Sequence, residues 1–204
     1  AGSVYLNHIN KLHDRSFSRE IRLNSKSSYF VFYCASQFRN FMTNLEEMSP
    51  EDNLKHKIKI CKFLKKIFLK KNIKLIYKQF PENIGNKKDP FFKILKKEIK
   101  KEKVIISSEN AVKIMHSVDL ILFDLISTGF GEAISINKPA LVYTNKFEYN
   151  RASSEGKKIN DLFYKAGIFF NNDSSGFRSI NIFKQKISYP VDKSIFLKKM
   201  KNIY

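Results

Sequence analysis

Cysteine is scarce in this sequence, and its two occurrences form no metal-binding or redox motif. The chain of 204 residues contains Cys34 and Cys61, and neither stands in a spacing typical of zinc sites or disulfide oxidoreductases. Both lie among apolar residues, where a free cysteine packs as a small hydrophobic side chain. No signal peptide precedes them, so the sequence predicts two free thiols in a reducing cytosol.

Long hydrophobic runs, internal repeats and low-complexity segments are also missing. A helix needs roughly 20 consecutive apolar residues to cross a bilayer, and no run approaches that length. Because 43% of the residues are hydrophobic, the chain can nevertheless bury a core. We therefore expect a globular protein of one large domain, or of one and a half small ones.

Acidic residues are few. The sequence has 19 Asp and Glu against 38 Lys and Arg, which gives a net charge of +19. This balance favours anionic partners such as nucleic acid, a lipid surface or a phosphorylated substrate. A second interpretation stays open, because lysine, asparagine, isoleucine and phenylalanine are all frequent, as in proteins from AT-rich genomes. In that case most lysines, including Lys65-Lys66 and Lys70-Lys71, form an ordinary solvated helix face.

Short apolar segments alternate with amphipathic segments from residue 29 to residue 170. Apolar runs without alternation are typical of central parallel strands, and apolar residues at helical spacing are typical of covering helices. The predicted strands are Tyr29–Cys34, Ile73–Tyr77, Val104–Ile106, Asp119–Asp124, Pro139–Tyr143 and Ile168–Phe170. The predicted helices are 50–71, 90–101, 110–116, 128–136, 158–166 and 192–202, with a loop at 144–155. This order predicts an α/β fold, a Rossmann-like parallel sheet of about six strands with helices on both faces.

Three regions follow from this pattern. Residues 1–27 are polar and weakly patterned, and we interpret them as an N-terminal arm or linker. Residues 28–172 carry the alternating strands and helices and form the Rossmann-like domain. Residues 173–204 are a polar C-terminal extension with a terminal helix.

Polar side chains gather where the predicted strands end, which is where ligands of open parallel sheets bind. Arg39 follows the first strand and Lys78 ends the second, and each is either a phosphate ligand or an ordinary surface cation. The most informative segment is Ser127-Thr128-Gly129-Phe130-Gly131-Glu132. Its small residues let backbone approach a ligand, and the first N–H groups of the following helix favour a phosphate. The alternative is that Ser127 only caps the helix and the glycines only permit tight packing.

These segments resemble the C-terminal nucleotide-binding domain of GT-B-fold glycosyltransferases of bacterial surface-polysaccharide biosynthesis. The similar families include CDP-glycerol glycerophosphotransferases and capsule or lipopolysaccharide transferases. The resemblance covers about residues 29–172, and it rests on Lys78-Gln79-Phe80-Pro81, Val118–Asp124, Ser127–Ala133 and Asn137–Tyr143. Related families often have Lys-Pro-His-Pro at the first of these segments, so Phe80 replaces the histidine and any role of that histidine is absent.

The resemblance implies a role for each part of the sheet edge. Donor phosphates would contact Ser127, Thr128 and Gly129, with Lys78 and Arg39 as further phosphate ligands, while Glu132 would bind the ribose and Ser107, Ser108 and Glu109 would lie near the base. The families generally need no bound metal, the sequence has no Asp-x-Asp motif, and the nucleotide-activated donor is a substrate, so no cofactor is expected. Inverting members commonly take their catalytic base from a second Rossmann-like domain. The sequence therefore identifies no catalytic residue.

The histidines give weaker signals. His8 and His13 lack a metal-ligand pattern, and His116 is expected to be packed or at the surface rather than catalytic. His56 lies among lysines of the first long helix, and we expect it to face solvent.

The expected function is donor binding by one half of a glycosyltransferase of surface-carbohydrate synthesis, with low activity alone. The expected partners are a nucleotide-activated sugar or CDP-glycerol-like donor, a glycan or glycolipid acceptor and an anionic membrane surface, but no specific nucleic acid. The expected location is the cytoplasm, including peripheral attachment at the inner face of the membrane. Two alternatives stay open: a non-catalytic regulatory Rossmann-like domain and a basic nucleic-acid-binding module.

Overall fold

The structure, a computed structural model, describes residues 29–36, 48–68, 73–78, 90–99 and 103–185. The strands are β1 (Tyr29–Cys34), β2 (Ile73–Lys78), β3 (Val104–Ser107), β4 (Leu120–Phe123), β5 (Ala140–Tyr143) and β6 (Phe169–Phe170). The helices are α3 (Pro50–Phe68), α4 (Pro90–Glu98), α5 (Ala111–Ser117), α6 (Thr128–Ser135), α7 (Lys146–Arg151), α8 (Ser154–Lys165) and α9 (Asp173–Gln185). The predicted arm at 1–27, Arg39, and the predicted helix at 192–202 lie outside the described residues.

All neighbouring strands of the sheet are parallel, and their order is β3-β2-β1-β4-β5-β6. The central strands β4 and β5 are buried along their whole length, which explains why their sequences are apolar without alternation. The strand order changes direction between β1 and β4, because β2 and β3 follow on one side of β1 whereas β4, β5 and β6 follow on the other. The predicted Rossmann-like α/β fold is confirmed.

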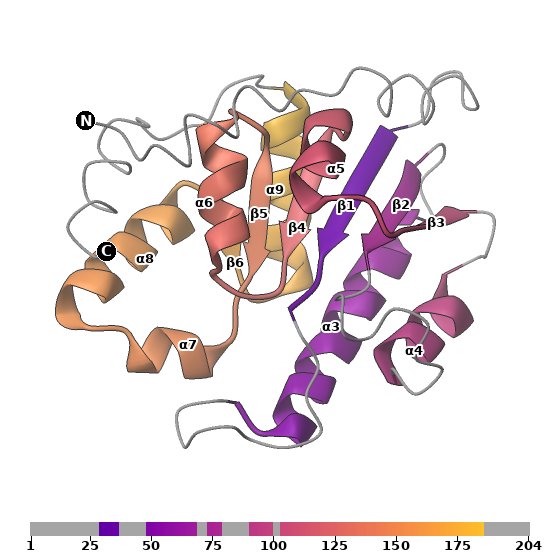
Figure 1. Cartoon of the computed structure of the whole chain (residues 1–204). Helices are drawn as coiled ribbons and strands as arrows, with labels where there is room; N and C mark the ends of the chain where they lie inside the picture. The colour runs from indigo at the N-terminus through magenta and orange to yellow at the C-terminus, as the bar shows by residue number, and fades with distance from the viewer. Residues whose placement is uncertain (1–28, 37–47, 69–72, 79–89, 100–102, 186–204) are drawn as a thin grey trace.

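Helices cover both faces of the sheet. In Figure 1, α5 and α6 lie in front of the strands, whereas α3 and α9 lie behind them. Helix α3 turns a stripe of buried side chains toward the sheet, formed by Ile60, Phe63, Leu64 and Ile67. Each such side chain contributes about 1.5–3 kcal/mol when it is fully buried. Helix α4 packs against α3, and its buried Phe91 and Leu95 extend the same core.

The predicted loop at 144–155 is wrong, because it contains helix α7 and the first two residues of α8. The Ser153 side chain accepts a hydrogen bond from the Gly156 N–H at 3.1 Å and caps α8, which begins at Ser154, four residues before the predicted start. Helix α7 is held by tertiary contact, since the Tyr149 hydroxyl donates to Asp161 of α8 at 2.9 Å. The predicted end of α8 is confirmed, because Gly167 follows it with a φ of 72°.

Helix α9 was not predicted, because its sequence is polar apart from a few apolar positions. The Asn172 side chain accepts from the Ser175 N–H at 3.0 Å at the beginning of the helix. Phe177 and the buried Ile180 then pack on the core, and the Phe177 ring lies 5.4 Å from the ring of Phe63. Tertiary packing therefore decides the helical state of this segment.

Replacing Gly176 with alanine should lower the free energy of unfolding by about 1–3 kcal/mol. A Cβ atom at this position would lie 2.6 Å from the Phe170 ring and 2.7 Å from the Phe63 ring, and both rings belong to the packed core. Gly156→Ala is the matched control, because its Cβ would meet neighbours only at 3.3 Å in a helical first turn. Chemical denaturation of both variants measures the difference, and equal stabilities would contradict the close approach of α9 to the sheet.

Candidate functional site

The carboxyl edge of the sheet opens where the strand order reverses, between β1 and β4. The chain leaves β1 toward α3 on one face and leaves β4 toward α6 on the other, so the two connections diverge. Open α/β sheets bind their ligands in the crevice that this divergence creates. In this chain the residues beside the crevice are Ser36, which follows β1, and Asp124, which follows β4 directly.

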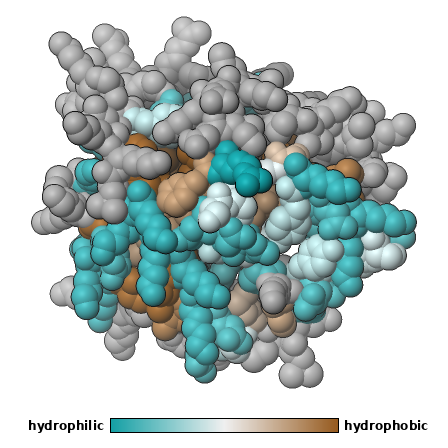
Figure 2. Space-filling model, turned by 180° about the vertical axis from the view of Figure 1, so that it is seen from behind, coloured by the Kyte–Doolittle hydropathy of each residue, from teal (hydrophilic) through white to brown (hydrophobic). Residues whose placement is uncertain are grey.

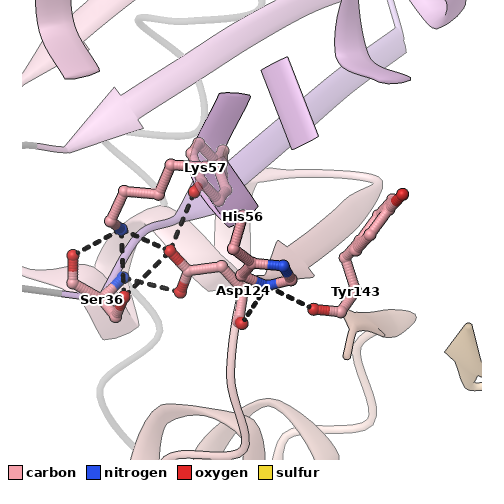
Figure 3. A network of polar contacts seen from close by, with 6 residues as sticks. Ser36, His56, Lys57, Asp124 and Tyr143 are labelled. Atoms are coloured by element: carbon pink, nitrogen blue, oxygen red, sulfur yellow. Dashed lines mark hydrogen bonds and ion pairs between the residues drawn. The ribbon is translucent and has the colours of Figure 1, made fainter. Parts of the chain in front are cut away.

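A buried ion pair lies at this switch point, where β1 and β4 end, and we call it and its hydrogen-bond partners the floor of the site (Figure 3). The Lys57 ammonium of α3 lies 2.6 Å from an Asp124 carboxylate oxygen, and each side chain is only 1% exposed. Asp124 also accepts hydrogen bonds from the Ser36 N–H at 2.7 Å, the Ser36 hydroxyl at 3.0 Å and the Tyr33 hydroxyl at 2.9 Å. Lys57 donates in addition to the Ser36 carbonyl at 2.9 Å. The network thus ties three segments together at the point where β1 ends.

The electrostatics of the network keep Asp124 ionised. Burial opposes the charge of this carboxyl, but the Lys57 ammonium and the hydrogen bonds from Lys57, Ser36 and Tyr33 outweigh burial and hold its pKa below the ordinary value. Burial and the neighbouring Asp124 charge raise the pKa of Tyr33 well above its ordinary value, so the phenol remains a donor. The floor is therefore polar and neutral as a whole, with its charges fixed in place.

His56 is a second buried polar group of α3, and the prediction that it faces solvent is wrong. Its Nε2 lies 2.9 Å from the Asp124 carbonyl and 3.1 Å from the Tyr143 carbonyl, at the ends of β4 and β5. Both partners are acceptors only, so Nε2 carries the proton and donates to them. Burial lowers the pKa of the imidazole, which keeps the ring neutral. Figure 3 shows His56 beside Lys57, reaching toward Tyr143 while Lys57 reaches toward Ser36.

The predicted phosphate-binding turn begins helix α6 at the same edge. Ser127 occupies the N-cap position with an extended backbone, but its side chain makes no capping hydrogen bond. Thr128 is exposed. A Cβ atom on Gly129 would lie 3.2 Å from the Phe123 ring and 3.5 Å from Met115, so tight packing by itself accounts for this glycine. Ser127 is therefore the N-cap residue of α6 without a side-chain capping bond, and packing alone accounts for Gly129.

The structure brings Lys78 together with the predicted base-binding loop. The Lys78 ammonium donates to the Glu109 carbonyl at 2.7 Å and to the Ser108 carbonyl at 3.4 Å. The Ser107 hydroxyl accepts from the Glu109 N–H at 3.1 Å, which gives the loop a fixed turn. Lys78 thus supports the loop after β3 in this structure, and its role as a phosphate ligand stays a prediction.

The negative charge of Glu132, on α6, acts on Cys34 at the end of β1. Burial, followed by the negative charges of Asp124 and Glu132, raises the pKa of the Cys34 thiol to about 12. Cys34 is the last residue of β1, next to the crevice. Because its pKa is raised, the thiol stays protonated. Of the predicted site residues, Glu132, Ser127 and Thr128 adjoin the switch point, Lys78 and 107–109 flank it on the β2–β3 side, and Arg39 is outside the described residues.

Sequence reasoning missed Lys57 as a site residue, although a signal for it exists. Lys57 stands three residues before Ile60 and seven before Leu64, which places it on the buried stripe of α3 rather than on the solvated one. A lysine in phase with core residues must find a partner, and Asp124, directly after the apolar strand β4, supplies it.

Two further searches of the described ranges concern metals and membranes. Among the residues that the structure describes, no three His, Cys, Asp or Glu side chains gather closely enough to hold a metal ion. Over the same residues, no helix combines the length and the apolar character needed to cross a lipid bilayer.

Comparisons with known proteins agree with this architecture. Residues 7–184 match the model of one protein family, whose description is LIC12162 family transferase. No curated protein matches the sequence. A solved structure described as a UDP-N-acetylglucosamine 2-epimerase from Listeria monocytogenes is 12% identical, with a TM-score of 0.59, and the match covers 98% of this chain and 50% of that chain.

Two other solved structures are similar at lower TM-scores. The MnaA protein of S. aureus, solved with UDP, is 18% identical with a TM-score of 0.48, covering 81% of this chain and 42% of that chain. The wall teichoic acid polymerase TagF, solved with CDPG, is 11% identical with a TM-score of 0.43, and the match covers 96% of this chain and 49% of that chain. The likeness to the epimerase shows the fold, the Rossmann-like sheet that makes up one half of the GT-B arrangement. The chain spans about half the length of that structure.

Proposed function

Because this chain belongs to the LIC12162 family of transferases, we propose that its carboxyl-edge crevice binds the nucleotide-activated donor of a glycosyl or glycerol-phosphate transfer. The observation that carries the proposal is the position of the Ser127-Thr128 turn. It begins α6 beside the strand-order reversal, and the Ser127 side chain is not used as a helix cap. Hydroxyl groups and the first N–H groups of a helix favour the oxygens of a diphosphate.

The proposed roles divide the crevice by chemistry. Ser127, Thr128 and the backbone at Gly129 bind the donor phosphates, and Glu132 accepts hydrogen bonds from the ribose hydroxyls. The loop at 107–109 lies beside the base, and Lys78 holds that loop through its two carbonyls. The Lys57–Asp124 pair fixes Ser36 at the end of β1 through four hydrogen bonds. Catalysis would then rest on positioning the donor and on neutralising the departing diphosphate.

The remaining parts of the proposal concern the whole reaction. We propose that the chain provides the donor-binding half of a GT-B glycosyltransferase of surface-carbohydrate synthesis, with low activity when it is alone. The acceptor would be a glycan or glycolipid, and a catalytic base would come from a second Rossmann-like domain. The proposed location is the cytoplasm, with peripheral attachment to the anionic inner face of a membrane. The donor acts as a substrate, and the proposal includes no cofactor.

Calorimetric titration with UDP, CDP, CMP and GDP should detect binding of at least one nucleotide, and Thr128→Ala should weaken it by roughly tenfold. The expected loss corresponds to one hydrogen bond to a charged group, about 1.5 kcal/mol. Ser154→Ala is the matched control, because Ser154 is an exposed hydroxyl in the first turn of α8. A folded protein that binds none of the nucleotides at millimolar concentration would refute the donor site and favour the regulatory or nucleic-acid alternatives.

A further inference from the structure

The solvent-facing side of α3 carries a continuous row of lysines. Lys55, Lys59, Lys62 and Lys66 follow one another at spacings of four, three and four residues, and all four are exposed. Residues at these spacings lie on one side of a helix. The row runs along α3 for roughly 16 Å, from 11 residues at about 1.5 Å each. We call these four residues the lysine ridge.

The neighbouring helix enlarges the positive surface. Helix α4 packs against α3 and presents Lys93, Lys96 and Lys97 as exposed residues. Figure 2 shows the molecule from the side of α3 and α9, and hydrophilic side chains dominate the described part of that face. Acidic side chains offset part of this charge, since Lys55 lies 2.7 Å from Glu51, but exposed lysines outnumber exposed acids on the two helices.

A hollow of about 440 Å³ lies against the ridge. Its lining is Lys59, Lys62, Lys65, Lys66, Glu98, Tyr143 and Asp173. The two carboxylates already have partners, since Lys65 lies 2.9 Å from Glu98 and Lys66 lies 2.5 Å from Asp173. Lys59 and Lys62 make no ion pair with any residue in the described ranges, so the hollow keeps an excess of positive charge.

The ridge and the crevice share one helix. Lys57 points into the crevice floor, and Lys59, two residues later, points to solvent. In Figure 1 the first turns of α3 extend past the carboxyl edge of the sheet. A partner that lies along the ridge would therefore lie beside the crevice without covering it.

The side chains of the ridge favour a diffuse anionic surface over nucleic acid. Lysine binds anions as a flexible point charge, whereas arginine is typical of directed phosphate and base recognition, and α3 and α4 contain no arginine. Single-stranded nucleic acid also needs exposed aromatic rings for stacking. The exposed large hydrophobic residues of the described chain are Ile106, Ile126, Phe147 and Leu162, and none of them lies on α3, α4 or α9.

We propose that the lysine ridge and its hollow dock the protein on a membrane surface rich in anionic lipid headgroups. This proposal rests on the proposed function, which includes attachment to an anionic membrane, and it names the residues that make this attachment. Each lysine near such a surface contributes about 1 kcal/mol to binding, so a few of them suffice for reversible attachment. The attachment would hold the crevice beside the bilayer, where a glycolipid acceptor is found.

Sedimentation with vesicles tests the ridge directly. The vesicles contain phosphatidylcholine with about a third phosphatidylserine, and pure phosphatidylcholine vesicles serve as the uncharged reference. Lys59→Glu/Lys62→Glu should weaken binding to the anionic vesicles by at least about tenfold. Lys158→Glu/Lys165→Glu is the control, because it changes the net charge equally at exposed positions of α8 and should cost less than about threefold. Lys59→Gln/Lys62→Gln provides a second variant in case the reversed charges disturb folding.

The outcomes separate this proposal from the donor site. Nucleotide titration of the ridge variant should give an unchanged affinity, because the ridge and the crevice are different surfaces. If no nucleotide binds while the ridge still determines vesicle binding, only the donor site fails. Equal losses in the α3 and α8 variants, no binding of the unmodified protein to anionic vesicles, or displacement from vesicles by equimolar duplex DNA would each overturn the membrane proposal.

Discussion

Replacing Lys57 with methionine is expected to lower the free energy of unfolding by about 3–5 kcal/mol, the usual cost of removing one partner from a buried ion pair. Methionine has a similar volume, so the loss comes from the charge that remains. Asp124 is 1% exposed and would keep only the hydrogen bonds from Ser36 and Tyr33. Single domains are typically stable by only about 5–15 kcal/mol, so this loss is a large share of the total.

The measurement is chemical denaturation of Lys57→Met, Lys57→Met/Asp124→Asn and Lys66→Met. The double variant removes both charges and should recover more than half of the loss, because the asparagine oxygen can accept from the Ser36 N–H while its NH2 group donates to the Ser36 and Tyr33 hydroxyls. Lys66→Met is the control, since the exposed Lys66–Asp173 pair should contribute no more than about 1 kcal/mol. A loss below about 1 kcal/mol in Lys57→Met, equal to the control, would show that the pair is not buried in solution.

The pH dependence of the same variant gives an independent check. Without Lys57, burial should raise the pKa of Asp124 in the folded state above its unfolded value. A group with a raised folded pKa stabilises the protein at low pH and loses that contribution as the pH rises through the folded pKa. The penalty in Lys57→Met should therefore be smaller in mild acid than at neutral pH, whereas the penalty from a lost packing contact would not change with pH.

The parallel sheet could be predicted from the sequence because its central strands are chemically unambiguous. Segments such as Phe30–Tyr33 and Leu120–Phe123 are apolar on both faces, and only a strand covered by helices on both sides buries such a run. The alternation with helices then fixes the class of fold. Local signals also located Gly167, which has a positive φ after α8. The exact bounds depend on caps such as Ser153, whose hydrogen bond to Gly156 is visible only in the structure.

Helices α7 and α9 could not be predicted because their stability comes from contacts far along the chain. The sequence around Tyr149 is rich in Asn, Arg and Ser, and the contact of this helix with Asp161, 12 residues further along the chain, is visible only in the structure. The polar sequence of α9 gives little helical signal, and the segment is held by Phe177 against Phe63 of α3. Local propensity is a weak guide wherever tertiary packing decides the outcome.

The sequence predicted where on the sheet edge the candidate site lies, but it did not predict the buried polar residues of its floor. The strand ends drew attention to Ser127 and Thr128, whose binding roles stay predictions. The lysine-rich composition of α3 hid Lys57 and His56, because the other five lysines of this helix all face solvent. Only the orientation of α3 against the sheet shows that these two side chains turn inward. In a chain this rich in lysine, the position of a lysine on its helix relative to the core residues says more about its role than the total count of lysines does.

Replacing His56 with leucine should lower the free energy of unfolding by about 2–4 kcal/mol. The imidazole N–H is the donor that joins the Asp124 and Tyr143 carbonyls at the ends of two adjacent strands. Leucine fills much of the space but leaves both buried carbonyl acceptors without this donor. Each unpaired acceptor costs about 1–3 kcal/mol of stability. The two costs add up to less than their sum, because the two carbonyls are neighbours. The edge-to-face contact with the Tyr143 ring, whose centroid is 5.6 Å away, is lost as well.

The response to pH distinguishes His56 from a packing residue. Burial lowers the folded pKa of His56 below its ordinary value of 6.5, so the unfolded chain binds the proton first. Stability from the neutral ring is therefore fully present above pH 6.5 and is lost as the pH falls from 6.5 through the folded pKa. Denaturation between neutral pH and mild acid should show this decline in the unmodified protein and a flatter profile in His56→Leu. His56→Gln keeps an N–H donor without a titrating ring, so it should be more stable than His56→Leu and equally flat. A decline of the same steepness in all three proteins would mean that other groups cause the acid sensitivity and that His56 is already solvated in the native state.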